Sequence, residues 1–219
     1  MKNKKITVRE LTTLAMITAI AYVLVATIRI PVVLFLKYEP KDVIITIGGF
    51  LMGPMAALAS SVVVALIEMV TISETGIIGC IMNFLSTCTY ACTAAIIYRR
   101  NHTQKGAVLA LAVGTVTMTA TMLLWNYLIT PLYMTGTSRS DIAGMLVPVF
   151  LPFNLIKAGL NSAITLLLYK PLVTGLRKAG LLPPSQSSGT GGNKSGVLIF
   201  AGLLLVSCVL LVLVFQGVI

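Results

Sequence analysis

The chain has 219 residues, of which 57% are hydrophobic and only 10% are charged, and its mean hydropathy is +0.98. A soluble domain of this size could not bury so much apolar surface, and several stretches reach the roughly 20 apolar residues that a membrane-spanning helix needs. The formal net charge of +10 does not indicate nucleic-acid binding, because the basic residues cluster between the hydrophobic stretches. The sequence therefore predicts an all-α, polytopic membrane helix bundle.

The first apolar stretch runs from about Leu11 to Ile30 and follows four basic residues, Lys2, Lys4, Lys5 and Arg9. Because cytoplasmic flanks of membrane spans are enriched in Lys and Arg, this flank predicts a cytoplasmic N-terminus. The stretch is long and has no clean small-residue cleavage site, so we expect a retained span rather than a signal peptide. Residues 29–43 mix two prolines and several charges with apolar residues and are expected to form an external loop or a partial helix.

The next apolar region, from Val43 to about Ile72, is long enough for one span or for two short ones. Gly53-Pro54 interrupts the helical hydrogen-bond ladder in its middle and favours a turn. Two crossings place the basic loop 98–105 and the basic segment 170–194 in the cytoplasm, whereas one crossing places both outside. The sequence therefore predicts a helical hairpin whose first arm, residues 42–52, is short.

Three further spans are predicted at about 77–98, 107–130 and 147–168. Residues 179–196 are rich in Pro, Ser and Gly and are expected to be a flexible linker. A last apolar run, Val197–Val218, has only Ser207 and Gln216 as polar side chains and is expected to place the C-terminus outside. The predicted organisation is a six-helix core over residues 1–178, the linker, and an appended seventh transmembrane helix over residues 197–219.

The span at 147–168 contains polar residues that are unusual in a membrane helix. Asn154, Lys157 and Asn161 are three and four residues apart and fall on roughly one helical face. A lysine in hydrocarbon costs at least about 2.5–3.5 kcal/mol, so this face is expected to line a polar cavity or a bound ligand. The alternative is that Lys157 pairs with Glu68 or Glu74 and only holds helices together.

Polar residues from other segments gather at the same external depth under this topology. They come from the first external loop and from four spans, and they are Lys37, Tyr38, Glu39, Lys41, Asp42, Glu68, Glu74, Asn83, Asn126, Tyr127, Tyr133, Asn154 and Lys157. Amides, hydroxyls and one intramembrane lysine suit an uncharged, flat, polyhydroxylated ligand better than a dianion, which would require several arginines.

The spans offer no catalytic or metal chemistry. They contain no histidine, no paired carboxylates on one helix and no nucleophile with a plausible base. The four cysteines lack metal-ligand spacing, and no Gly-rich phosphate loop ends in Lys-Ser or Lys-Thr, so the chain cannot itself hydrolyse ATP. We therefore expect a binding protein that is not an enzyme and has no cofactor or metal.

A second feature lies on the first span, where Ala15 and Ala19 form a small-x-x-x-small pair. This pattern lets another helix approach closely in lipid. The residues alone leave two interpretations open, which are packing within this chain and docking of a partner subunit.

Five segments resemble the riboflavin-specific substrate-binding (S) components of energy-coupling factor (ECF) vitamin transporters. They are FLKYEPKDV (35–43), GGFLMGPMAAL (48–58), ETGIIGCIMNFLST (74–87), WNYLITPLYM (125–134) and PFNLIKAGLNS (152–162), and the resemblance covers most of residues 8–175. It implies a six-helix bundle in the cell membrane that captures riboflavin from the outer face and has no enzyme activity. It also implies partners on other chains, a transmembrane T component and two cytoplasmic ATPases. The appended seventh helix departs from the family, whose usual member ends after the sixth.

The resemblance implies roles for individual residues as well. The first external loop would close the site, helices four to six would hold most of the ligand, and Ala15 and Ala19 would dock the T component. The expected riboflavin-binding residues are Leu36, Tyr38, Glu39, Asp42, Asn83, Asn126, Tyr127, Tyr133, Asn154, Lys157 and Asn161. The alternatives are an S component for a different vitamin and a non-transporting membrane assembly subunit. A self-sufficient ion-coupled carrier is disfavoured, because the sequence shows no buried charge relay.

Overall fold

The computed structural model describes residues 7–34, 36–73, 76–133, 138–180 and 194–218, and the structural statements below concern these residues. Its elements in chain order are α1 (Val8–Thr27), β1 (Ile30–Val33), β2 (Leu36–Tyr38), α2 (Lys41–Met52), α3 (Pro54–Thr71), α4 (Gly76–Arg100), α5 (Gln104–Tyr133), α6 (Arg139–Met145), a π-helical turn (Leu146–Phe150), α7 (Leu151–Lys178) and α8 (Lys194–Phe215).

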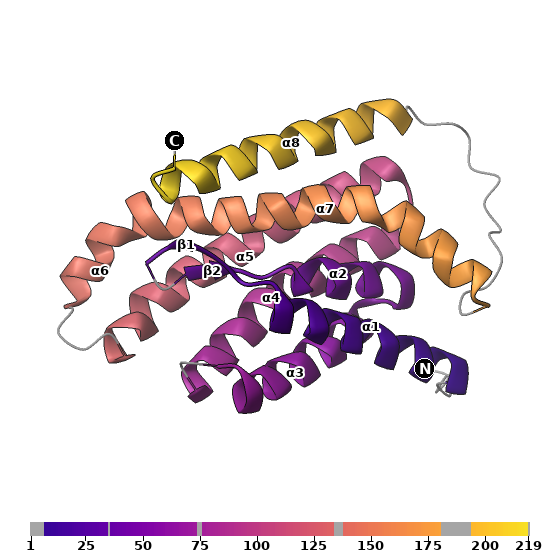
Figure 1. Ribbon diagram of the computed structural model, residues 1–219, viewed down its shortest axis with the longest axis horizontal. Coiled ribbons are helices and arrows are strands. Elements are labelled where there is room, and N and C mark those ends of the chain that lie inside the picture. Colours follow the sequence, from indigo (N-terminus) through magenta and orange to yellow (C-terminus); the bar gives the residue numbers. More distant parts are fainter. Residues whose placement is uncertain (1–6, 35, 74–75, 134–137, 181–193, 219) are drawn as a thin grey trace.

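Six helical stretches in the described ranges are long and apolar enough to cross a membrane. They are α1, α3, α4, α5, the continuous stretch from α6 to α7, and α8. Figure 1 shows α7 and α8 along one edge of the bundle and α1 and α3 along the other. The predicted all-α bundle, a six-helix core with an appended helix, is confirmed.

The short helix α2 is the buried centre of this bundle. All of its residues from Lys41 to Phe50 are buried, and it packs against α1, α3, α4 and α7. With 12 residues it is the short arm that the sequence predicted. Because an unpaired buried charge is very costly, the charged residues at its start, Lys41 and Asp42, need partners inside the protein.

The predicted hairpin turn at Gly53-Pro54 is also confirmed. Gly53 separates α2 from α3 and has a φ of +96°, which glycine adopts without steric strain. Pro54 is the first residue of α3, where its missing N–H leaves no helical hydrogen bond unmade. The two arms approach closely, since a Cβ built on Gly49 would lie 3.1 Å from the Cβ of Ala57.

The loop between α1 and α2 contains a small antiparallel sheet. In it, Ile30 of β1 is opposite Tyr38 of β2, and Pro31 is opposite Lys37. The partial helix considered for residues 29–43 is therefore wrong, except that α2 begins at Lys41. Pro31 and the β-branched residues Val32 and Val33 favour extended backbone over helix, which explains the difference.

The sixth span begins earlier than predicted. Ser138 caps α6 by accepting a hydrogen bond from the Asp141 N–H, and the Asp141 side chain accepts one from the Ser138 N–H. This capping box starts a helix within the segment that the sequence left as loop. The π-helical turn at Leu146–Phe150 contains Pro148, which lacks the N–H of a regular α-helical bond, and the helix then continues as α7.

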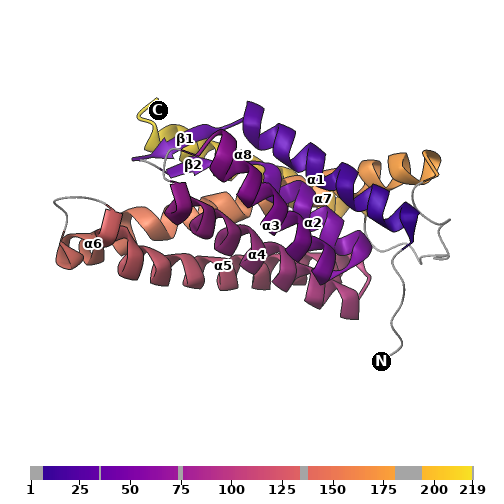
Figure 2. The same ribbon diagram turned by 90° about the horizontal axis from the view of Figure 1, so that it is seen from below.

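The appended helix α8 lies along α7 and also contacts β1. Viewed from the perpendicular direction, the C-terminal end of α8 lies beside the β1–β2 hairpin (Figure 2). Cys208 and Val212 of α8 belong to a buried apolar cluster that includes Leu36 and Tyr38 of the hairpin and Phe153 of α7. The added helix is therefore packed onto the core at the hairpin end.

Candidate functional site

The Asp42 carboxylate joins three helices at the start of α2. Asp42 is fully buried. It accepts hydrogen bonds from Thr87 Oγ1 of α4 at 2.6 Å and from Asn161 Nδ2 of α7 at 3.2 Å. Lys157 Nζ, one turn before Asn161, lies 3.4 Å from Asp42 Oδ2 and donates to Ser86 Oγ at 3.3 Å. The polar face predicted on the sixth span is thus brought to the α2 N-terminus by two of its three residues.

A second ion cluster surrounds Lys41, the residue before Asp42. Lys41 Nζ lies 2.5 Å from Glu39 Oε2 and 2.7 Å from Glu68 Oε1 of α3. Asn83 Nδ2 of α4 donates to Glu68 Oε2 at 2.8 Å. These contacts connect the loop before α2 with α2, α3 and α4 in the protein interior.

Arg29 lies at the edge of this second cluster. Its Nε is 3.4 Å from Glu39 Oε1, and its Nη1 donates to the Ile72 carbonyl oxygen at 2.9 Å. The network formed by these contacts contains three cations, Arg29, Lys41 and Lys157, and three carboxylates, Glu39, Asp42 and Glu68. Because it is neutral as a whole, it does not by itself attract a charged ligand.

Glu39 lies in the loop, outside the membrane-spanning helices. Burial alone would raise the pKa of this carboxyl, but the nearby charges of Lys41, Lys157 and Arg29 outweigh burial and lower the pKa below its ordinary 4.5. Because the folded-state pKa is the lower one, the ion pairs of Glu39 contribute their full stability above pH 4.5 and lose it as the pH falls further.

Several buried polar atoms have no hydrogen-bond partner in the described part of the chain, and two of them belong to predicted site residues: one residue precedes Glu39 in the chain and the other donates to Asp42. They are Tyr38 Oη and Asn161 Oδ1. Tyr38 is 4% exposed and Asn161 is fully buried. A buried polar atom without a partner costs about 1–3 kcal/mol, so each of these atoms calls for an explanation. Hydrogen bonding to a ligand would satisfy both.

The other predicted site residues lie around the network in different ways. Leu36 and Tyr38 are buried in the cluster that contains Phe153 and Ile156 of α7. Asn154 donates to the Phe150 carbonyl oxygen of its own helical stretch at 2.7 Å. Asn126 similarly donates to the Met122 carbonyl oxygen at 2.8 Å. These two amides are buried, but the hydrogen bonds of their side-chain N–H groups stay within their own helices.

The two remaining predicted site residues, both tyrosines, belong to α5. Tyr127 is 39% exposed, so its side chain points outward from the bundle. The side chain of Tyr133 lies outside the described residues. The assignment of both residues to the site stays a prediction.

The alternative pairing of Lys157 is wrong for Glu68, since Glu68 pairs with Lys41 and Lys157 pairs with Asp42. Glu74 lies outside the described residues.

The sequence interpretation placed Lys41 on the external side but left it out of the site. A role for Lys41 could have been predicted from the run Glu39-Pro-Lys-Asp42 at the start of a short apolar helix, because each buried charge there needs a partner of opposite charge.

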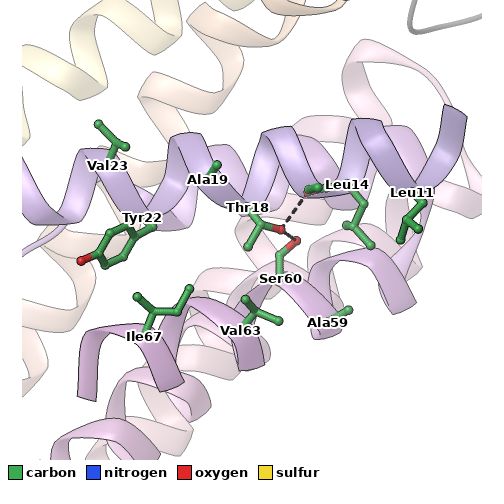
Figure 3. A pocket seen from close by; sticks show the side chains of 11 residues that line it. Leu11, Leu14, Thr18, Ala19, Tyr22, Val23, Ala59, Ser60, Val63 and Ile67 are labelled. Carbon is green, nitrogen blue, oxygen red and sulfur yellow. Dashed lines mark hydrogen bonds between the residues drawn. The ribbon is translucent and has the colours of Figure 1, made fainter. Parts of the chain in front are cut away.

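A second surface feature is an open groove between α1 and α3. It has a volume of about 460 Å³ and is lined by Leu11, Leu14, Ala15, Thr18, Ala19, Tyr22, Val23, Ala59, Ser60, Val63 and Ile67. Figure 3 shows the Thr18 and Ser60 hydroxyls meeting across it, 2.8 Å apart. Ala15 and Ala19 are exposed, so their small side chains leave this face of α1 accessible instead of packing inside the chain.

Together the fold and the buried network define a multi-pass membrane protein built around a polar interior site. The chain belongs to the family of ECF transporter substrate-specific components, whose family model matches residues 9–169.

Individual relatives agree with this assignment. The riboflavin transporter RibU of Staphylococcus aureus is 30% identical over 178 residues, covering 78% of this chain and 93% of that protein. The riboflavin transporter FmnP of Bacillus subtilis is 27% identical over 186 residues, covering 78% and 97%. A solved structure described as the S component of a bacterial ECF transporter has 30% identity and a TM-score of 0.64, and covers 77% of this chain and 98% of that one.

The first prediction concerns Lys41. Replacing it (Lys41→Met) leaves Glu39 and Glu68 without their shared cation and is expected to destabilise the protein by about 3–5 kcal/mol. The melting temperature of the purified protein in detergent measures the effect, and Lys105→Met, at an exposed position, is the matched control. The double variant Lys41→Met/Glu68→Gln should lose less than the sum of the single losses. Additive losses would show that the two side chains are not energetically coupled.

Proposed function

We propose that this chain is a riboflavin-binding S component that captures the vitamin at the external face of the cell membrane. The observation that carries the proposal is the pair of unpartnered atoms, Tyr38 Oη and Asn161 Oδ1, beside a neutral ion network. A phenol and an amide oxygen can hydrogen-bond a neutral polyhydroxylated molecule, and the apolar cluster around Tyr38 can contact a flat ring. The names of the two relatives support riboflavin as that molecule.

We assign the binding role to the residues expected from the sequence, with Lys157, Asn161, Asp42 and Tyr38 at the centre. Lys41 and Glu68 join them as a supporting ion pair, because Lys41 precedes Asp42 and also pairs with Glu39 of the loop. Residues 1–178 form the binding domain in this proposal, residues 179–196 the linker and residues 197–219 an added helix. The chain binds its ligand without chemical change.

Uptake requires other chains in this proposal. The basic flank of α1 and the basic ends of α4 and α7 favour a cytoplasmic N-terminus, so the ion network lies toward the outside. A transmembrane T component, docked on the α1–α3 groove, and two cytoplasmic ATPases would supply the energy. Family membership supports such an assembly, and the exposed alanines of the groove support its location.

The decisive experiment is an absorbance spectrum of the purified protein. We expect bound flavin with quenched fluorescence, because the ring is expected to lie among buried side chains. A competition panel of vitamins against the bound flavin separates riboflavin from another vitamin as the substrate. If no ligand co-purifies and none binds on addition, the chain acts instead as a membrane assembly subunit.

The Tyr38 hydroxyl provides a sharper test of the site. Because this group has no partner in the described part of the chain, Tyr38→Phe should not lower the melting temperature of the ligand-free protein. Loss of one hydrogen bond to riboflavin should weaken affinity by about 0.5–1.5 kcal/mol, or roughly 2- to 13-fold. Fluorescence titration measures the affinity.

Tyr90→Phe is the matched control for that substitution. The Tyr90 hydroxyl is already hydrogen-bonded to Ser162 Oγ at 2.8 Å, so its loss should lower stability more than affinity. Unchanged riboflavin affinity in Tyr38→Phe would remove the Tyr38 hydroxyl from the site.

The groove gives a separate prediction. Ala19→Leu adds bulk where the T component is expected to approach, so it should reduce riboflavin uptake in cells without changing riboflavin affinity of the purified protein. Ala120→Leu makes the same change at an exposed position of α5 and should leave uptake intact. Equal uptake by the two variants would argue against docking at this groove.

A further inference from the structure

The appended helix α8 contacts the part of the site that lies in the external loop. Family members matched above align with about four fifths of this chain over nearly their whole length, and the family model ends at residue 169. Helix α8 therefore lies beyond the matched family region. It contacts α7 and β1.

The first contact is polar. Gln216, one of the two polar side chains in an otherwise apolar run, donates from Nε2 to the carbonyl oxygen of Pro31 at 2.6 Å. Pro31 lies in β1, which pairs with β2 along one edge. The other edge of a two-stranded sheet presents unpaired backbone groups, and in or near lipid these are costly. Gln216 therefore supplies a partner to the free edge of the hairpin.

The second contact is apolar. Cys208 and Val212 of α8 are 5% and 8% exposed and share a buried cluster with Val32, Leu36 and Tyr38 of the hairpin. The same cluster includes Phe153, Ile156 and Leu160 of α7. The hairpin is thus packed against two helices, α7 of the core and the added α8.

The fit between α7 and α8 is close where the hairpin is held. A Cβ built on Gly159 of α7 would lie 2.7 Å from Cys208 Sγ, so a larger residue at position 159 would force the Cys208 side chain or α8 to shift. Gly159 lies between Lys157 and Asn161, the two α7 residues that reach Asp42. The same segment of α7 therefore faces the ion network on one side and α8 on the other.

A hairpin whose strands have only four and three residues has little stability of its own, so its position depends on its surroundings. This hairpin carries Tyr38 and leads directly into Glu39, which pairs with Lys41 and Arg29. Any outward movement of the hairpin would withdraw the Tyr38 side chain from its buried cluster on α7 and weaken the Glu39 ion pairs.

We propose that α8 is a positioning element of the ligand site, in which Gln216 and Val212 hold the β1–β2 hairpin closed and slow the release of bound ligand. The part concerning release rests on the proposed riboflavin function, whereas the part concerning the hairpin does not.

Two full-length variants test the proposal. Gln216→Leu removes the N–H donor with little change in size, and Val212→Ala removes apolar contact with the hairpin. Each should raise the riboflavin dissociation rate constant about 2- to 10-fold, the range expected for one hydrogen bond or a small apolar contact. Stopped-flow fluorescence measures it, and the association rate constant should change less. Val214→Ala, the same truncation at a side chain that is 54% exposed, should change neither rate.

A second readout needs no ligand. Amide hydrogen exchange of residues 30–38 in the ligand-free protein should be faster in both variants than in the wild type, while exchange in α3 should be unchanged. Gln216→Lys keeps an N–H donor on a side chain of similar length and should restore slow exchange and slow dissociation. A Lys variant as fast as the Leu variant would overturn the role of the Gln216 hydrogen bond.

The outcomes separate the two proposals. If the wild type binds no flavin, the riboflavin function fails, and hydrogen exchange still decides whether α8 holds the hairpin. If flavin binds but neither variant changes exchange or dissociation, the role of α8 is overturned and the function stands. Faster dissociation without faster exchange in residues 30–38 also overturns it, because α8 would then act elsewhere.

Discussion

The buried Asp42 carboxylate is the group on which the arrangement of the site depends. At the start of the central helix α2, it accepts hydrogen bonds from Thr87 of α4 and Asn161 of α7 and forms an ion pair with Lys157 of α7. A carboxylate and an ammonium in an apolar interior are tolerated only when each is paired and hydrogen-bonded. Pairing therefore fixes how α2, α4 and α7 meet. It uses the Nδ2 group of Asn161 and leaves the amide oxygen, Oδ1, without a hydrogen-bond partner in the described part of the chain.

The short length of α2 makes this arrangement possible. A helix that spanned the membrane would carry its N-terminal charges to the surface, whereas α2 ends at Gly53 after 12 residues and keeps Lys41 and Asp42 buried. The compensating charges come from the loop before it and from α3 and α7. The resulting network is neutral, which agrees with a neutral vitamin as the proposed substrate.

The β1–β2 hairpin connects this network with the appended helix. Its residues Leu36 and Tyr38 pack on α7 from inside the bundle, and α8 covers the same cluster from the other side. Glu39, immediately after β2, enters the ion network through Lys41. A helix outside the matched family region thus contacts the short segment that leads into the ion network.

The membrane spans, the hairpin turn at Gly53-Pro54, the appended helix and the polar face of Lys157 and Asn161 could be predicted from the amino-acid sequence, because apolar length, helix-breaking residues and helical spacing are local properties. The folded structure was needed to show that Lys157 pairs with Asp42 and Lys41 with Glu68, and that the Asn126 and Asn154 side chains donate to their own helices. It was also needed to show that residues 30–33 and 36–38 pair as a hairpin that contacts α8. Those outcomes depend on which of several charges and faces come together when the helices pack. These pairings join segments that are far apart in the chain, and residue spacing along a single helix does not show which segments will meet.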